Sequence, residues 1–554
     1  MYTQVFDPVG DSLLASAIFA ALPLLTLFIL LGALKVQARF AALAALLVAI
    51  LVAIIVYSMP VDQALLAGTE GAAFGFFPIL WIVIAAIWVY NMTEESGHFA
   101  VLRRTFGRLS SDQRVQAVIV AFAFGALIEG LAGFGAPVAI TAIMLVGLGF
   151  KPGKAAALAL IGNTAPVAFG SIAVPITTLA TITELPKDDL GAQVGLQTPF
   201  LALFVPFILV FVVDGRRGLR ECWPAALVGG VTFALMQFIC SHYISVELTD
   251  IIASLASTGA LLLLLRVWAP GEPLEVSGAG PRPRIAGAAA TDTAFEQTVT
   301  RKDREHDSGR EVFESLVPYI IIVAVFAIAQ IGPIKTALTD TIVTFKWPGL
   351  DVVNPDGEVV SSTTFNLNYL PTSGTLMFIC GFLTMLALRI KPSTALRVLG
   401  STLRQLAPAI VTVMAVLALA YVMNLSGQTV TLGLWLAGAG GFFAFLSPIV
   451  GWLGVAVTGS DTSSNALFGA LQVAAAKDAG IDPTLLAAAN SSGGVLGKMI
   501  SPQNLAIGAA AVGMAGREGD LFRRVVGWSI VMLLGMAVLV YLQSTALDFM
   551  IVGN

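Results

Sequence analysis

Residues 126–176 form an apolar stretch that is interrupted by groups which a bilayer-spanning helix rarely contains. Glu129 lies there beside a run of glycines and Pro137, and the pair Asn163–Thr164 follows just before Pro166. In the hydrocarbon region every backbone polar group needs an internal partner, so irregular backbone and carboxylates occur only against other protein or a polar cavity. The stretch therefore predicts a broken membrane segment that lines a binding cavity.

The composition places this stretch in a polytopic membrane protein. Hydrophobic residues make up 57% of the 554-residue chain and charged residues only 12%, against about 25% charged in a typical soluble domain. Apolar runs recur at the length of about 20 residues that spans a bilayer, and they predict an all-α fold of about 12 spanning helices plus two helical hairpins. The spans are expected at 12–34, 39–58, 72–92, 155–183, 199–213, 222–241, 250–268, 313–332, 371–389, 405–424, 484–516 and 525–549, and the hairpins at 115–150 and 432–476.

Lys and Arg residues are sorted between the two sides of this layout. Of the 30 Lys and Arg residues, 25 fall in loops on one side and four in loops on the other, and Lys498 lies inside an apolar segment. By the positive-inside rule the larger group is cytoplasmic. Both chain termini are then expected to face away from the cytoplasm, with the first span retained.

Part of the sequence pattern repeats. The spacing N-x6-G-x4-P begins at Asn163 and recurs from Asn490, and a Gly- and Ser-rich bend with one acid precedes each copy, at Glu129 and Asp461. The charge pattern gives the two copies opposite orientations across the membrane. Such inverted-topology repeats are typical of secondary transporters with a midplane site between the halves. The predicted units are a first inverted repeat at 1–214, a connecting helix pair at 215–268, a cytoplasmic linker at 269–311 and a second inverted repeat at 312–554.

Each copy is expected to contain a helix that breaks near the membrane centre. Thr164 is expected to cap a half-helix in the first copy, and Ser491 or Ser492 in the second. The two positive dipole ends would then face each other and bind a small anion such as a carboxylate. Alternatively, these residues only satisfy broken backbone or allow close helix packing. The candidate substrate-binding residues are Asn163, Thr164, Asn490, Ser491, Ser492 and Lys498.

Three charged side chains are expected inside the membrane, where each costs roughly 2.5–3.5 kcal/mol on insertion scales. Glu129 has no basic neighbour in its own segment, so we expect it to carry the proton in a coupled cycle. Asp461 is either a second proton-coupling group or the structural partner of Lys498. Lys498 is alternatively a direct ligand of a substrate carboxylate. A salt bridge without a transport role, and a Glu129 that stays protonated, remain open.

Four long strings cover these regions: EGLAGFGAPVAITAIMLVGLGFKP, NTAPVAFG, TGSDTSSNALFGALQ and NSSGGVLGKMISPQ. They resemble the lactate permease family of bacterial proton-coupled transporters, and weaker similarity extends over almost the whole chain. The resemblance implies symport of L-lactate, D-lactate or glycolate with protons across the bacterial inner membrane. Both termini would then be periplasmic.

Two other functions remain open at this point. One is a sodium-coupled carrier of other small carboxylates. The other is an intramembrane enzyme that uses Glu129 and Asp461 as paired acids, although an enzyme needs no inverted repeat. No metal site is expected, because the three cysteines are isolated, and no ATP hydrolysis, because the string at 493–499 lacks the Ser or Thr of a P-loop. No cofactor and no nucleic-acid partner are expected either.

Overall fold

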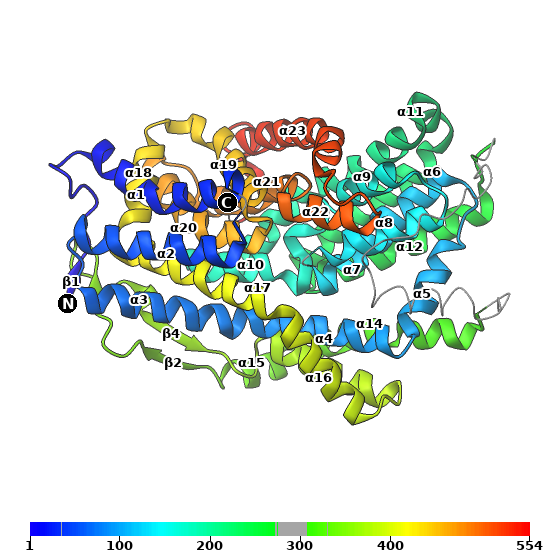
Figure 1. Ribbon diagram of the computed structural model, residues 1–554, viewed down its shortest axis with the longest axis horizontal. Helices are drawn as coiled ribbons and strands as arrows, with labels where there is room; N and C mark the ends of the chain where they lie inside the picture. Colours follow the sequence, from blue (N-terminus) through cyan, green and yellow to red (C-terminus); the bar gives the residue numbers. More distant parts are fainter. Residues whose placement is uncertain (35, 134, 272–273, 275–306, 330, 554) are drawn as a thin grey trace.

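In the computed structural model, apolar helices form nearly all of the chain (Figure 1). The structure describes residues 1–554 except 35, 134, 272–273, 275–306, 330 and 554. The helices up to residue 267 are α1 (Leu13–Phe28), α2 (Ala38–Ile55), α3 (Val61–Phe74), α4 (Trp81–Glu95), α5 (His98–Gly107), α6 (Gln113–Gln116), α7 (Gly125–Ala132), α8 (Ala136–Gly147), α9 (Pro152–Gly162), α10 (Gly170–Thr183), α11 (Lys187–Tyr243) and α12 (Thr249–Val267). Those that follow are α14 (Gly309–Ala329), α15 (Gly332–Thr339), α16 (Ser373–Ala387), α17 (Pro392–Ser426), α18 (Gln428–Ala437), α19 (Phe443–Thr458), α20 (Asp461–Ala479), α21 (Pro483–Lys498), α22 (Pro502–Ala511) and α23 (Glu518–Gln543).

The long apolar helices confirm an all-α membrane protein. In the described part of the chain, ten helices are long and apolar enough to cross a membrane, or up to eleven when the bent pair α9–α10 counts as one span. The sequence predicted about 12 spans, because each arm of α11, the 15-residue α16 and the broken pair α21–α22 were counted as spans. Conversely, Gln113–Ala132 and Gly440–Thr458 are among the ten, but the sequence prediction placed them in the hairpins.

Helix α11 consists of two arms that turn at Asp214–Gly215, where Gly215 has φ 59° and ψ −144°. The arms run antiparallel and pack through glycines. A Cβ added at Gly195 would lie 1.9 Å from Ser241 Oγ, and one at Gly230 would lie 2.8 Å from the Leu203 carbonyl oxygen. The predicted spans 199–213 and 222–241 are therefore both present. The predicted boundary at 214/215 coincides with the turn between the two arms.

The two predicted helical hairpins are confirmed. In the first, π-helical turns at Ala117–Phe124 join α6 to α7, and α8 follows after a turn that contains Gly133 and Gly135. In the second, Gly459 ends α19 and α20 begins at Asp461. All three glycines have positive φ, a conformation that costs little only without a Cβ. One acid therefore lies near each hairpin tip.

The first predicted helix break is confirmed, but its geometry differs from the expectation. Helices α9 and α10 are bent by 65° around residues 163–169. The first turn of α10 is left-handed, with φ between 48° and 59° from Ser171 to Ala173. Thr164 does not cap α10, because its Oγ1 donates backward to the Leu160 carbonyl oxygen at 3.4 Å.

In the second copy, the predicted position of the break is wrong. Helix α21 runs without interruption through Asn490–Ser492 to Lys498, so neither Ser491 nor Ser492 caps a half-helix. The break follows at 499–501, where Ser501 caps α22 by accepting from the Asn504 backbone N–H.

Close helix packing explains the glycines of α21. A Cβ at Gly493 would lie 2.1 Å from the Pro448 carbonyl oxygen, and one at Gly497 would lie 2.3 Å from that of Trp452. Conversely, a Cβ at Gly451 of α19 would lie 1.9 Å from the Asn490 carbonyl oxygen. Small residues that let two backbones meet are common between membrane helices. The glycines of NSSGGVLGK therefore bring α19 and α21 together rather than breaking α21.

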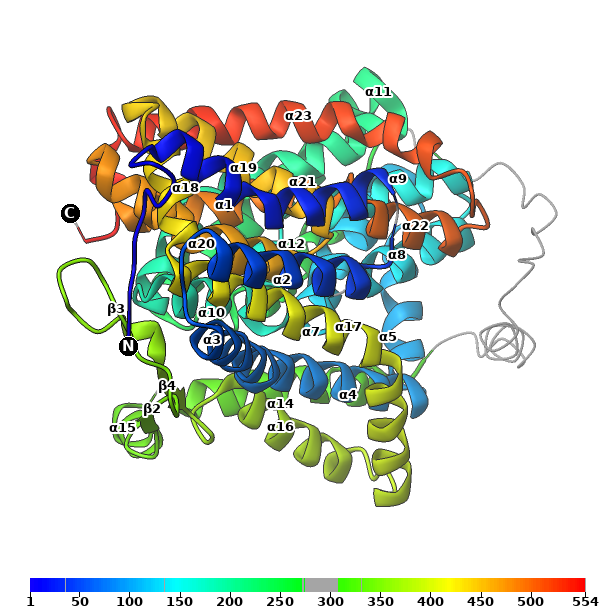
Figure 2. The ribbon, with the colours of Figure 1, turned by 60° about the vertical axis from the view of Figure 1, so that its left-hand side comes forward.

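The hairpins and broken helices lie inside a frame of longer helices. Helices α14 and α16 lie at one side of the molecule and α23 at the opposite side in both views, and α17 passes between α2 and α3 (Figures 1 and 2). Helices α7, α10, α20 and α21 meet in the interior, where α10 packs on both α7 and α20.

The loop at 333–370 carries short strands that the sequence did not predict. Strand β1 (Tyr2–Thr3) pairs in parallel with β3 (Val352–Val353), and β2 (Val343–Lys346) pairs antiparallel with β4 (Thr364–Leu367). The N-terminal residues thus join this loop, and both termini lie at the same end of the molecule (Figure 2). The predicted linker at 269–311 lies largely outside the described residues.

Candidate functional site

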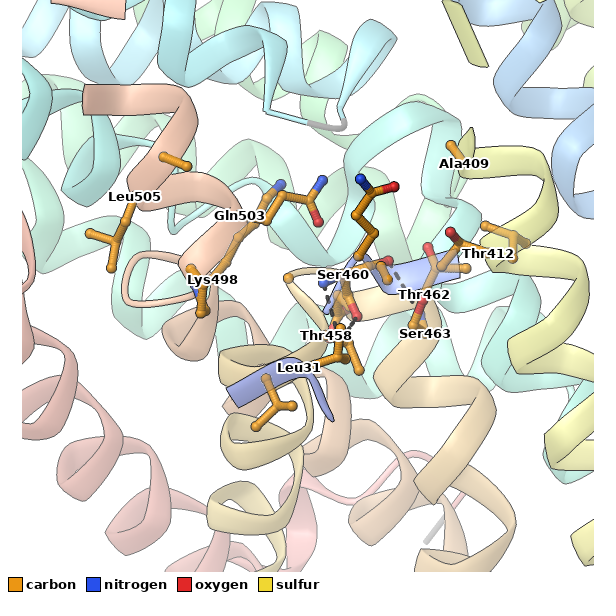
Figure 3. Close-up of a pocket in the computed structure, with 18 of the residues that line it drawn as sticks. Leu31, Ala409, Thr412, Thr458, Ser460, Thr462, Ser463, Lys498, Gln503 and Leu505 are labelled. Carbon is orange, nitrogen blue, oxygen red and sulfur yellow. Dashed lines mark hydrogen bonds between the residues drawn. The ribbon is translucent and has the colours of Figure 1, made fainter. Parts of the chain in front are cut away.

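A cavity of about 870 Å³ opens between the tip of the α19–α20 hairpin, the α9–α10 break, α17 and the end of α21 (Figure 3). Its volume is within the range of small-molecule sites, about 300–1,000 Å³. Glu129, Asp461 and Lys498 all contribute to its wall. Arg39, Gln405, Glu518 and neighbouring residues line it as well, and these belong to loops or loop edges that the charge pattern predicts to be cytoplasmic.

Glu129 and Lys498 form a buried ion pair at the cavity wall. Lys498 Nζ donates to Glu129 Oε1 at 2.6 Å, and the two side chains are 9% and 3% exposed. Asn163 Nδ2 donates to the other carboxylate oxygen of Glu129 at 2.9 Å. Gly170 makes room for the carboxylate, because a Cβ there would lie 2.7 Å from Oε1. The hairpin acid is thus held by the helix break of its own half and by a cation from the other half.

The structure therefore pairs Lys498 with Glu129 and not with Asp461. Asp461, the acid in the same copy of the repeat, was the predicted partner of Lys498. The observed partner lies 369 residues earlier in the chain. Glu129, which has no basic neighbour in its own segment, is the acid that contacts the Lys498 ammonium.

The side chains that donate hydrogen bonds to Asp461 are uncharged. Ser491 Oγ donates to Asp461 Oδ2 at 2.6 Å, and Asn465 Nδ2 approaches the same oxygen at 3.5 Å. Asp461 Oδ1 has no hydrogen-bond partner among the described residues. The side chain lines the cavity although the residue is only 2% exposed. Asp461 can therefore accept a hydrogen bond or a proton at Oδ1 without breaking an existing contact.

Asn490 belongs to a chain of buried amides behind Asp461. Asn490 Nδ2 donates to Asn465 Oδ1 at 2.9 Å, and Gln472 Nε2 donates to Asn490 Oδ1 at 3.2 Å. Asn465 Nδ2 in turn donates to the Pro175 carbonyl oxygen in α10 at 3.1 Å. This chain connects α20, α21 and α10, so Asn490 holds the hairpin against both broken helices.

The structure divides the residues selected from sequence into two layers. Glu129, Asp461 and Lys498 line the cavity. The other five are almost fully buried behind its wall and do not line it: Asn163, Thr164, Asn490, Ser491 and Ser492. Asn163 and Ser491 nevertheless reach the cavity indirectly, because each donates to one of the two lining acids.

Hydroxyl groups outside the set predicted from the sequence line the cavity directly. Figure 3 shows Thr458, Ser460, Thr462 and Ser463 of the second hairpin tip beside the space, with Thr412 of α17 nearby. Ser171, in the left-handed turn of α10, lines it too. The string TGSDTSSN contained the signal, since a cluster of hydroxyls around one acid is unusual in an apolar segment.

The helix N-termini that border the cavity are not those predicted at Thr164 and at Ser491 or Ser492, but those of α20 and α22. Helix α20 begins at the cavity with Ser460 as its cap, and Ser460 Oγ accepts from the Ser463 backbone N–H. Helix α22 begins there at Pro502. The positive ends of these helix dipoles and the Lys498 ammonium all favour a bound anion.

Comparison with known proteins gives one family. The family model described as L-lactate permease matches residues 16–547. The L-lactate permease of Bacillus subtilis (strain 168) is 39% identical over 99% of this chain and all of the relative. Two Escherichia coli (strain K12) proteins cover all of both chains, an L-lactate permease at 42% identity and the glycolate permease GlcA at 40%.

Among solved structures, the YdaH transporter of Alcanivorax borkumensis, whose crystal structure is described as revealing an unusual topology, aligns over 87% of each chain. The TM-score is 0.46 and the identity 14%. The match to the family model and the identity to whole permeases together exclude the enzyme alternative. The chain is a multi-pass inner-membrane transport protein, and it belongs to the L-lactate permease family.

Proposed function

We propose that this chain carries L-lactate, D-lactate or glycolate into the cell together with protons. The named relatives support this substrate class, because they are permeases of L-lactate and of glycolate. The cavity supports it too, since it presents a cation, two helix N-termini and several hydroxyls to a small hydroxylated carboxylate.

The observation that carries proton coupling is the 2.6 Å ion pair between Lys498 and Glu129. While Glu129 is ionised, its carboxylate forms an ion pair with the Lys498 ammonium. A proton on Glu129 neutralises that carboxylate and releases the ammonium charge for the carboxylate of the substrate. Proton and substrate then bind together, because an unprotonated Glu129 competes with the substrate and an unpaired buried Lys498 is costly.

Asp461 is the second proposed proton-coupling group. Its side chain lines the same cavity, its Oδ1 has no partner among the described residues, and Ser491 orients Oδ2. In this scheme Asn163 and Ser491 position the two acids, and the hydroxyls of the second hairpin tip contact the substrate. Asn490, Ser492 and Thr164 support the site from behind. The substrate therefore lies in front of the predicted polar residues rather than between them.

In this proposal the cavity opens towards the cytoplasm, because residues of predicted cytoplasmic loops line it. Both termini would then be periplasmic. Transport requires the cavity to close on that side and open on the other. We propose that the two units containing the hairpins move against the frame of the remaining spans. A crosslink that locks a hairpin unit to the frame should stop transport, and full transport in the locked protein would contradict this motion.

Uptake by the purified protein in proteoliposomes tests the coupling. With an inward proton gradient and no sodium, the wild type should accumulate labelled L-lactate against its gradient. Glu129→Gln should abolish accumulation. Glu70→Gln is the matched control, because Glu70 is also a buried carboxylate, 1% exposed on α3, but does not line the cavity. Full accumulation by Glu129→Gln would disprove the carrier assignment. A requirement for sodium would favour the sodium-coupled alternative.

A further inference from the structure

Another buried carboxylate, Asp250, lies in the first turn of α12 and does not line the cavity described above. The residue is 1% exposed. Gln237 Nε2 approaches its Oδ1 at only 3.5 Å, and its Oδ2 has no partner among the described residues. A buried carboxylate with so few hydrogen bonds is costly as an anion.

Asp250 lies directly behind the hairpin that carries Glu129. A Cβ at Gly130 would lie 3.3 Å from Asp250 Cβ, so the two chain segments are in contact. Three ionisable groups act on Asp250 or lie beside it: Glu129 of α7, Lys498 of α21 and Cys240 of α11. Glu129 thus lines the cavity and belongs to the hairpin that Asp250 contacts. Asp250 itself does not line the cavity.

Buried polar side chains continue from Asp250 between the arms of α11 and α23. Gln237 contacts Asp250, and its Oε1 accepts from Thr198 Oγ1 at 3.2 Å. On the next face of α11, Gln197 Nε2 donates to Gln543 Oε1 at 3.1 Å. One turn further along, Gln193 Oε1 accepts from the Val552 backbone N–H at 2.9 Å, close to the C-terminus. The row therefore leads from Asp250 to the end of the molecule that carries both termini (Figure 2).

Several atoms of this row have no partner among the described residues, namely Gln193 Nε2, Gln197 Oε1, Gln543 Nε2 and Asp250 Oδ2. The first three belong to residues of 0% exposure. Buried polar atoms without a protein partner are usually satisfied by ordered water. Free donors and acceptors at successive positions provide bonding sites for a file of water molecules. Water can pass protons along such a file, whereas the amides alone cannot.

We propose that Asp250 relays protons from the face bearing the termini to Glu129, through water held by Gln193, Gln197, Gln543 and Gln237. Asp250 as the neutral acid transfers its proton to the ionised carboxylate of Glu129, which breaks one O–H bond and forms another. Asp250 then regains a proton from the adjoining water. The proton on Glu129 leaves later through the cavity. This relay rests on the proposed proton coupling and assigns its entry side.

Net uptake and exchange distinguish a relay from a binding role. Net proton-driven uptake needs a new proton on Glu129 in every cycle. Exchange of labelled for unlabelled L-lactate does not, because the carrier can stay protonated throughout. In proteoliposomes, Asp250→Asn should slow net uptake at least tenfold and leave exchange within twofold of wild type. Gln197→Leu should also slow net uptake. Ser254→Ala on the same helix is the control and should change neither rate, since among the described residues Ser254 Oγ donates to the Ile251 carbonyl oxygen alone.

Each possible result supports or rejects the proposed relay. Unchanged net uptake by Asp250→Asn would overturn it, and so would a parallel loss of uptake and exchange, which marks a binding or structural residue. If Asp250→Asn does not fold, judged by gel filtration and thermal unfolding, Gln197→Leu decides alone, and its unchanged uptake would overturn the water route. Loss of accumulation in Glu129→Gln with normal uptake in Asp250→Asn would leave the proposed function intact and reject only the relay. Normal accumulation in both variants would reject both proposals.

Discussion

Lys498 Nζ lies 2.6 Å from Glu129 Oε1, and the two residues are 369 positions apart in the chain. Glu129 stands near the tip of the first hairpin, whereas Lys498 is the last residue of α21. Both are almost fully buried and both line the cavity. A change in either partner therefore affects an element of the other half of the chain.

Removing Lys498 should destabilise the protein through the charge that it leaves behind. In Lys498→Met the Glu129 carboxylate loses its cation while still buried, a change that typically costs about 3–5 kcal/mol. The double variant Glu129→Gln/Lys498→Met removes both charges and should recover much of that loss. Thermal unfolding in detergent of the two single variants and the double variant gives the coupling energy. Additive losses would show that the two groups do not stabilise each other.

The second hairpin tip offers a test of substrate contact with adjacent serines. Ser463 lines the cavity, whereas Ser464 faces α19 and its Oγ donates to the Gly451 carbonyl oxygen at 3.2 Å. Loss of one neutral hydrogen bond costs about 0.5–1.5 kcal/mol. Ser463→Ala should therefore raise the KM for L-lactate by up to about tenfold with little change in folding stability.

The control Ser464→Ala should lower the unfolding temperature and leave KM unchanged. Initial rates of uptake over a range of L-lactate concentrations measure KM for both variants. An unchanged KM in Ser463→Ala would show that the substrate does not contact this side of the cavity.

Local sequence patterns were enough to predict the membrane spans and both hairpins. Spans follow from the length of apolar runs, and the tips follow from glycines beside a single acid, as at Gly133 and Gly459. The same reasoning failed in α21, because glycine both breaks helices and allows them to pack closely. Only the proximity of α19 to Gly493 and Gly497 shows which effect operates.

The contacts of the site could be predicted less well than its acids. An intramembrane charge is visible in the sequence because it is rare there, so Glu129, Asp461 and Lys498 were found. The pairing of Lys498 depends on how two distant segments meet, which no local pattern encodes. Asp250 was missed because it lies at the start of an apolar run, where an acid normally belongs to the adjoining loop. Its burial comes from the contact of α12 with the first hairpin.

Close packing in α21 predicts that alanine is not tolerated at Gly493. The added Cβ would lie 2.1 Å from the Pro448 carbonyl oxygen, so α19 and α21 have to separate. Overpacking of this kind typically costs about 1–3 kcal/mol. The control is Gly527→Ala in α23, where a Cβ would meet nothing within 4 Å. Thermal unfolding should show a clear loss for Gly493→Ala only. Equal stability of the two variants would contradict the packing of α21 and return Gly493 to the role of a helix breaker.

The loop between α11 and α12 predicts a pH-dependent contribution to stability. Glu247 lies there, accepts from Ser245 Oγ at 2.8 Å and forms an ion pair with Lys187 at the start of α11. Burial by itself raises the pKa of Glu247, but the Lys187 ammonium and the hydrogen bonds outweigh burial and lower the pKa to about 2. Because the folded-state pKa lies below the ordinary value of 4.5, this stabilisation is fully present above pH 4.5 and is lost as the pH falls towards 2.

Lys187→Met should therefore destabilise the protein at neutral pH and have less effect in acid. The loss at neutral pH should be about 1–2 kcal/mol rather than the 3–5 kcal/mol of a fully buried pair, because the Lys187 side chain is 34% exposed and water screens it. Thermal unfolding at neutral pH and at about pH 3 measures both values. The control Lys335→Met replaces an exposed lysine of α15 and should leave the stability unchanged at both pH values. A stability difference between wild type and Lys187→Met that stays constant on acidification would mean that Glu247 does not titrate through this pair.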